Sequence, residues 1–192
     1  DDVQSMVRFL LYTDDFDVEG LIASSGTFAN VANKANILSI LDVYDKVREQ
    51  LAAHDRRYPA TSALRSITWQ GRSGTWGGPA VGGSYKPLDD ILGEGKDSEA
   101  SDAIIQVVDK LDPRPVWICV WGGSREIAQA IWKVRATRTP KQLQQFIGKL
   151  RVFLIAKQED EAAWLLDSFP TLFVILSEKN YMGMFWNMVN TE

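Results

Sequence analysis

The chain has 192 residues, of which 45% are hydrophobic and 24% charged, and its formal net charge is −4 at pH 7. This composition indicates one folded domain, and the mild acidity without a basic stripe argues against nucleic acid as a partner. No apolar run is long enough to span a bilayer, so we expect no membrane partner. Because Cys119 and His54 are each the one residue of their type, a disulfide scaffold and a clustered His/Cys zinc site are excluded.

The first part of the chain predicts helix, strand and helix. A helical face begins at once, with apolar residues at Val3, Met6, Val7, Leu10 and Leu11. Residues 17–25 are typical of a strand that runs into a loop of small residues, and a long helix follows between Ile37 and Leu51. Residues 58–97 show no sustained period and are rich in Gly, Pro, Ser and Trp. So long a connection is usually functional or mobile.

The second part alternates helices with strands. A helix is predicted to begin near Ser98, and Val116–Trp121 is a short apolar run suited to a buried parallel strand, with Trp117 in the core. Further helices are expected at 127–134, near Pro140 and at 162–169, and further strands at 151–156 and 172–176. The alternation predicts an α/β domain with a doubly wound, mainly parallel sheet and helices on both faces.

In a doubly wound sheet, ligands bind outside the carboxyl ends of the strands. This rule directs attention to residues 24–30, to Trp121–Arg125 and to the end of the strand at Ala156. The glycines in Trp121–Glu126 let backbone approach a ligand, and the following helix offers N–H donors. The spacing is neither that of a dinucleotide fingerprint nor that of a P-loop.

Two acidic segments allow both a structural and a functional interpretation. Asp1 and Asp2 open a helix, where carboxylates act as caps, but they are also the ligands that Ca²⁺ prefers. Gly95–Glu99 is either a helix start capped by Asp97 or Ser98, or a ligand contact through Lys96 and Asp97. Of the tryptophans, Trp69 and Trp76 in the long connection are the candidates for stacking on a sugar ring.

An ordered series of segments across essentially the whole chain resembles the nucleoside-hydrolase superfamily. The most similar group within it is that of the bacterial cellulose-binding, nucleoside-hydrolase-like proteins. The segments are DDVQSMVRFLLY, FDVEGLIASS, the stretch from Tyr58 to Thr68, GEGKDSEASD, DPRPVWICVWGG, AQAIWKVRATRTP, LRVF, FPTLF and NYMGMF. The resemblance implies a Rossmann-like fold of the nucleoside-hydrolase type.

The resemblance also implies site residues. Asp1 matches the family aspartate that contacts the ribose hydroxyls, so it is our candidate catalytic and substrate-binding residue, and Asp2 matches the one that binds Ca²⁺. A backbone carbonyl that also ligates Ca²⁺ would fall in Gly123–Arg125, with Arg125 as our choice. Thr27, with Ser25 beside it, lies nearest the place of a loop residue that contacts the sugar.

The implied activity is hydrolysis of an N-glycosidic or related sugar bond by a calcium-bound water, in carbohydrate metabolism. The alternative is a carbohydrate-binding domain, for cellulose for example, that keeps the fold without turnover. The changed residues at 156–160 and at Met182 favour this alternative. A structural domain of a larger surface protein is a third reading. Whether the chain is an enzyme therefore stays open.

The remaining expectations concern the whole molecule. We expect residues 1–192 to form one nucleoside-hydrolase-like domain that is incomplete at both ends, because the family's first strand and last calcium aspartate have no counterpart here. The partner is expected to be a sugar-containing small molecule or an oligosaccharide, with a homo-oligomer as an open option. No signal peptide precedes Asp1, but the mature form of a periplasmic or secreted bacterial protein would look the same, so the location is left open.

Overall fold

The computed structural model describes residues 2–74 and 87–177. Within them the elements follow one another in a mixed helix and strand order. They are α1 (Asp2–Leu10), β1 (Leu21–Ala23), α2 (Lys34–His54), α3 (Thr61–Ser66), β2 (Thr68–Gln70), α4 (Leu88–Ile91), α5 (Glu99–Val108), β3 (Val116–Val120), α6 (Arg125–Thr137), α7 (Pro140–Lys149), β4 (Leu150–Leu154), α8 (Asp160–Ser168) and β5 (Phe173–Leu176). No helix in this described part is both long and apolar enough to cross a membrane.

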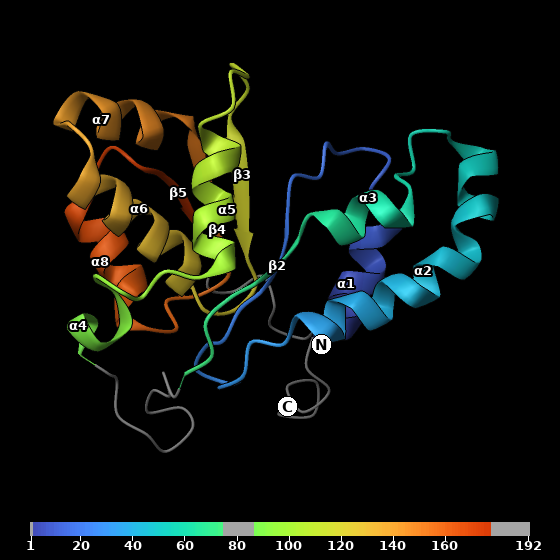
Figure 1. Cartoon of the computed structure of the whole chain (residues 1–192), viewed down its shortest axis with the longest axis horizontal. Helices are drawn as coiled ribbons and strands as arrows, with labels where there is room; N and C mark the ends of the chain where they lie inside the picture. Colours follow the sequence, from blue (N-terminus) through green and yellow to red (C-terminus); the bar gives the residue numbers. More distant parts are fainter. Residues whose placement is uncertain (1, 75–86, 178–192) are drawn as a thin grey trace, which may run out of the picture.

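All paired strands run parallel, as the sequence predicts. β1 pairs with β2, and β3, β4 and β5 pair in that order, so the described strands form two sheets. In chain order, β2 is added beside β1, and later β4 is added beside β3 and β5 beside β4 (Figure 1). The α/β fold with parallel strands is thus confirmed.

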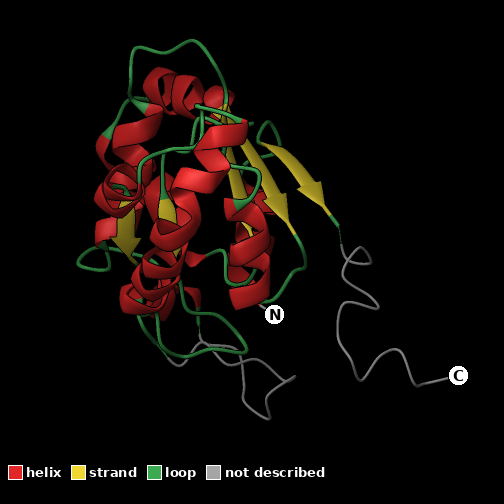
Figure 2. Ribbon diagram, turned by 90° about the vertical axis from the view of Figure 1, so that its right-hand side faces the viewer, coloured by secondary structure: helices red, strands yellow, loops and turns green. Residues whose placement is uncertain are grey.

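Each sheet has its own hydrophobic core. Met6, Leu10, Leu21, Leu41, Tyr44 and Leu64 form one cluster around α1, β1, α2 and α3. A larger cluster joins β3 and β4 to the helices that cover them, with Ile127, Ile131, Leu150, Leu154 and Leu165 almost wholly buried. Figure 2 shows these helices packed on one side of the strands. The molecule is therefore organised as two apolar halves.

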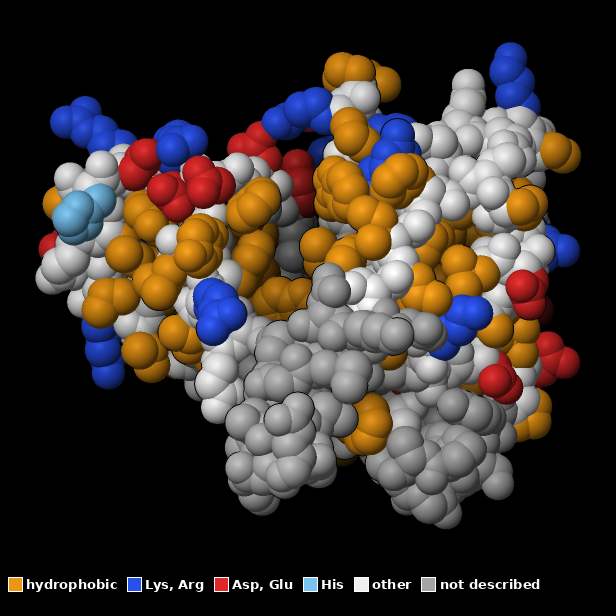
Figure 3. All heavy atoms as spheres, turned by 180° about the vertical axis from the view of Figure 1, so that it is seen from behind, with side chains coloured by type: hydrophobic (Ala, Val, Ile, Leu, Met, Phe, Trp, Pro, Cys, Tyr) orange, Lys and Arg blue, Asp and Glu red, His pale blue; other side chains and the backbone are white. Residues whose placement is uncertain are grey.

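The far face of β3–β4–β5 is apolar but exposed. Trp117 is 53% exposed and packs edge-on against Phe173, and Cys119 and Ile175 are exposed on the same face. Figure 3, which views the molecule from behind, shows hydrophobic side chains at the surface of both halves. The prediction of a fully buried strand at 116–121, with Trp117 in the core, is wrong, because helices of the described residues cover one face of this sheet.

Two further expectations needed revision. The strand expected over residues 17–25 is limited to Leu21–Ala23. The connection at 58–97, which has no sustained period, contains α3, β2 and α4. Each is six residues or shorter, and a window so short cannot display a helical or strand period. Helix α2, the Ser98 cap of α5 and the proline start of α7 are as predicted.

The two halves meet along a polar and glycine-rich surface at the carboxyl ends of the strands. We call this surface the seam; it joins residues 25–27 and 70–72 of the smaller half to residues 96–98, 123–126 and 159 of the larger half. Gly123 makes its closest approach there. A Cβ added to Gly123 would overlap the Ser25 carbonyl oxygen and lie 2.9 Å from the Cα of Gly26. Glycine is required here because two backbones touch.

Replacing Gly123 by alanine is expected to lower the free energy of unfolding by about 1–3 kcal/mol, because the methyl group must push two backbone segments apart. The matched control is Gly122→Ala, since a Cβ at Gly122 meets nothing within 4 Å. That control is expected to change stability by less than about 0.5 kcal/mol. Urea unfolding of the three proteins measures both values, and equal effects of the two substitutions would contradict the close packing of the seam.

Candidate functional site

The seam lies between the two described sheets, β1–β2 and β3–β4–β5, where loops that follow their strands meet. Ligands in α/β folds with parallel strands bind outside the carboxyl ends of the strands. The loops that follow β1, β2, β3 and β4 all contribute to the seam. It is therefore the place in this fold where a ligand site is expected.

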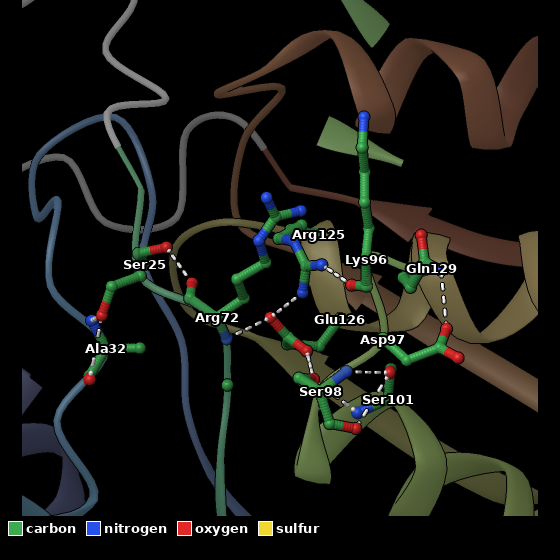
Figure 4. A network of polar contacts seen from close by, with 12 residues as sticks. Ser25, Ala32, Arg72, Lys96, Asp97, Ser98, Ser101, Arg125, Glu126 and Gln129 are labelled. Carbon is green, nitrogen blue, oxygen red and sulfur yellow. Dashed lines mark hydrogen bonds and ion pairs between the residues drawn. The ribbon is translucent and has the colours of Figure 1, made fainter. Parts of the chain in front are cut away.

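The centre of the seam is the carboxylate of Glu126, in the first turn of α6. Its Oε1 accepts a hydrogen bond from Arg125 Nη1 at 2.6 Å and another from the Arg72 backbone N–H at 3.0 Å. Its Oε2 accepts from the Ser98 hydroxyl. Figure 4 shows these groups converging from separate elements. One carboxylate thus connects the end of β2 in the smaller half to α5 and α6 in the larger half.

Arg125 is a buried cation whose charge is compensated locally. Its side chain is 0% exposed and that of Glu126 is 4% exposed. A second guanidinium nitrogen donates to the Lys96 carbonyl. An ion pair excluded from water is costly unless its hydrogen bonds are complete, and removal of one partner leaves the other charge buried. Arg125 and Glu126 must therefore be considered as one unit.

The segment 96–98 serves mainly as the start of α5. Ser98 is the N-cap, and its side chain and that of Ser101 form a reciprocal capping box, so the structural interpretation of this segment is confirmed. Asp97 accepts hydrogen bonds from Gln129 at 2.7 Å and pairs with Lys133 at 2.8 Å. Burial opposes ionisation of Asp97, but these two partners outweigh it and hold its pKa below the usual value.

The Lys96 side chain differs from its neighbours, because it extends away from the Arg125–Glu126 pair (Figure 4). Its backbone carbonyl accepts a hydrogen bond from Arg125, so the backbone at Lys96 is fixed while the ammonium group points away from the pair. Arg72 contributes a second cation near the same pair. Desolvation and the nearby positive charge of Arg125 lower the pKa of Arg72, and Glu126 partly offsets both.

Ser25 and Thr27, the two predicted sugar contacts after β1, lie in the seam and are buried. The Ser25 hydroxyl donates to the Arg72 carbonyl at 2.6 Å. The Thr27 backbone N–H donates to Glu159 Oε1 at 2.6 Å, and its hydroxyl lies 2.8 Å from the Gln158 carbonyl and 2.9 Å from Glu159 Oε1. In this arrangement both side chains connect one segment of the seam to another.

Glu159 and Glu161, at the start of α8, are two buried carboxyl groups. They are 4% and 0% exposed. Burial raises the pKa of Glu159, although hydrogen bonds from Thr27 and the Ser124 N–H favour its charged form. Burial, followed by repulsion from Glu159, raises the pKa of Glu161 to about 8. Within the described residues, Glu159 Oε2 and both Glu161 carboxyl oxygens lack a hydrogen-bond partner.

Trp69 lies on β2, half-buried, with the Lys34 ammonium 5.8 Å from its ring centroid. Lys34 in turn pairs with Glu99 at 3.1 Å, and Glu99 also accepts from the Gln70 N–H at 2.7 Å. That backbone hydrogen bond, together with Lys34, lowers the pKa of Glu99 against the opposing effect of burial. The predicted ring-stacking residue is therefore next to, and not inside, the Glu126 network.

The described part of the chain contains two of the expected site residues for calcium, Asp2 and Arg125. Asp2 is exposed in the first turn of α1, Arg125 is buried at the start of α6, and Asp1 and Trp76 lie outside the described residues. No three His, Cys, Asp or Glu side chains in residues 2–74 and 87–177 gather closely enough to hold a metal ion. The calcium site at Asp2 and the Arg125 carbonyl therefore stays a prediction.

Comparison with known proteins places this arrangement in a family. A family model described as "Cellulose-binding Sde182, nucleoside hydrolase-like domain" matches residues 1–192.

The chain belongs to this family. A solved structure, that of a nucleoside hydrolase-related hypothetical protein from Saccharophagus degradans that is associated with carbohydrate metabolism, is similar with a TM-score of 0.80 and 40% sequence identity. The match covers 90% of this chain and 39% of that one. This chain therefore spans well under half the length of that relative. No curated protein matches the chain.

Several residues of the seam have no distinctive sequence signal. Glu126 stands within the quoted Trp121–Glu126 elbow, but a glutamate in the first turn of a helix is ordinary and carries no sign of burial. Arg72 lies in a connection without a period. Glu159 and Glu161 resemble acidic residues that complement a helix dipole. The signal that could have identified Glu126 is its position one residue after Arg125, directly behind a glycine turn.

Replacement of Glu126 by alanine is expected to cost about 3–5 kcal/mol, because it leaves the buried Arg125 charge and the Ser98 hydroxyl without their acceptor. The control is Asp109→Ala, which removes the partner of Arg138 in a surface pair at 2.6 Å. That change is expected to cost less than about 1 kcal/mol. Thermal and urea unfolding provide the comparison. If both variants lost the same stability, the Glu126 network would be no more important than a surface pair.

Proposed function

We propose that this domain binds a carbohydrate at the seam. The observation that carries the proposal is the convergence of polar groups from the loops after β1, β2, β3 and β4 where the two sheets meet. Sugars are recognised by arrays of hydrogen-bonding groups held rigidly, often beside an aromatic ring. The family description, which names cellulose binding, supports the same class of ligand.

The groups expected to contact the sugar are those not already used to join the two halves. The Lys96 ammonium extends away from the network (Figure 4). Trp69 offers a half-buried indole on β2, with the Lys34 ammonium over its ring. Ser25, Thr27 and Asp97 are hydrogen-bonded to protein groups, so in this proposal they position the wall of the site. Trp76 remains a candidate outside the described residues.

Substitution of Lys96 by alanine is expected to weaken binding of cellopentaose or ribose about tenfold, because a charge-assisted hydrogen bond contributes roughly 1.5 kcal/mol. Isothermal titration of the wild type and of Lys96→Ala measures the change, with Trp69→Ala as a second variant. Lys141→Ala, an exposed lysine on α7, is the control and should bind as the wild type does. Unchanged binding by both site variants would show that the seam is not the sugar-binding site.

A second candidate function is hydrolysis of an N-glycosidic or related sugar bond. It is favoured by the 40% identity to a structure described as nucleoside hydrolase-related. In this proposal Asp1 is the catalytic and sugar-binding residue, Asp2 a calcium ligand and the Arg125 carbonyl another. Ca²⁺ would supply a water activated for attack on the sugar carbon.

Turnover is tested by release of uracil from uridine and of p-nitrophenol from p-nitrophenyl β-riboside. For a hydrolase, Asp1→Asn is expected to lower the rate by at least about a hundredfold, as loss of a catalytic group does. Asp45→Asn, an exposed carboxylate of α2, is the control and should retain the rate. Sugar binding without measurable turnover by the wild type would instead identify a binding domain.

A further inference from the structure

The start of α8 holds more negative charge than its surroundings compensate. Glu159 and Glu161 are 4% and 0% exposed, and Arg125, the cation that acts on Glu161, is already paired with Glu126 at 2.6 Å. Asp160, between the two glutamates, is exposed and adds a further negative charge nearby. An uncompensated buried carboxylate is strongly unfavourable. This corner of the fold therefore requires a proton or a cation.

The oxygen atoms at this corner include some that no protein group uses. In the described residues, Glu159 Oε2 and both carboxyl oxygens of Glu161 have no hydrogen-bond partner. The same holds for the hydroxyl of Ser124, which is 2% exposed. Ser124 lies next to Glu159, because its backbone N–H donates a hydrogen bond to the Glu159 carboxylate. The hydroxyl is a separate observation from the acidic pair, because a side chain buried without a partner is a missing contact in its own right.

We propose that Glu159, Glu161 and Ser124 form a binding site for a hard divalent cation, with Ca²⁺ as the first to be tested. Ca²⁺ takes oxygen ligands from carboxylates, carbonyls and hydroxyls and completes its shell with water. The two carboxylates would balance the charge of the cation. The site differs from the calcium site expected at Asp2 and the Arg125 carbonyl, and it does not depend on the proposed sugar binding.

Such a cation would act on the wall of the seam. Glu159 already binds the backbone and hydroxyl of Thr27, and Ser124 begins the turn into α6. A cation held by these residues would connect the loop after β1, the turn after β3 and the start of α8. It would thereby order the segment that carries Ser25 and Thr27.

The test measures Ca²⁺ binding and Ca²⁺-dependent stability of the full chain after removal of metals with EDTA. The wild type is expected to bind Ca²⁺ in isothermal titration and to unfold at a higher temperature when Ca²⁺ is present. Glu161→Gln is expected to weaken binding at least tenfold and to abolish the Ca²⁺-dependent rise. In EDTA the same variant is expected to be as stable as the wild type or more stable, because a buried amide needs neither a proton nor a cation.

Two controls separate this site from its neighbours. Asp160→Asn changes the exposed carboxylate between the two ligands, and Asp2→Asn changes the ligand expected from the family; both should leave the binding at Glu161 intact. Ser124→Ala should weaken it. The proposal is overturned if the wild type binds no Ca²⁺, if Asp2→Asn alone abolishes binding, or if Glu161→Gln loses the same stability with and without Ca²⁺. In the second case the proposed hydrolase site would stand while this one fails.

Discussion

The buried carboxylate of Glu126 is the interaction on which the arrangement of the site depends. It accepts from Arg125, from the Arg72 backbone and from Ser98, which belong to α6, to the end of β2 and to the cap of α5. Without Glu126, each of these groups would lose a buried acceptor. Because a carboxylate has a fixed separation between its two oxygens, satisfying all three donors allows few relative placements of these elements.

Around that carboxylate the two halves meet largely through backbone and polar contacts. Two apolar contacts also join them, because Ile22 packs against the larger cluster and Phe9 lies edge-on to Trp121. Their apolar clusters are separate, and Gly26 and Gly123 bring two loops into direct contact where any side chain would intervene. The pairs at the other end of the strands, Arg114–Asp17 and Lys110–Glu19, are exposed and contribute little. The position of one half on the other is therefore determined mainly at the strand ends, where the candidate site lies.

Much of the fold could be predicted from the sequence, because long elements carry a repeating pattern. Helix α2 has 21 residues, enough for several turns of a helical stripe, and α7 begins at a proline as expected. Strand β2 has three residues and no pattern that distinguishes it from a loop. The burial of Trp117 was predicted wrongly for another reason. An apolar strand indicates that both of its faces are covered, but the sequence of the strand does not show which residues cover them.

The location of the candidate site could be predicted from the sequence, but several of its residues and its contacts could not. The rule for strand ends directed attention to residues 24–30 and 121–125, and Ser25, Thr27 and Arg125 do lie in the seam. Glu126 and Glu159 escaped notice because burial decides their roles, and an acidic residue at a helix start has the same sequence pattern whether it is solvated or buried. Long-range pairing such as Thr27 with Glu159, 132 residues apart, has no local signature.

The separation of the two apolar cores has a consequence for the cooperativity of unfolding. Elements that share a core tend to open together, whereas a polar boundary lets neighbouring units open with different free energies. The half built on α1, α2 and β1 and the half built on β3 to β5 would then behave as two units in amide hydrogen exchange. A ligand held by residues of both halves would bind only when the two are closed, and would so make them exchange as one.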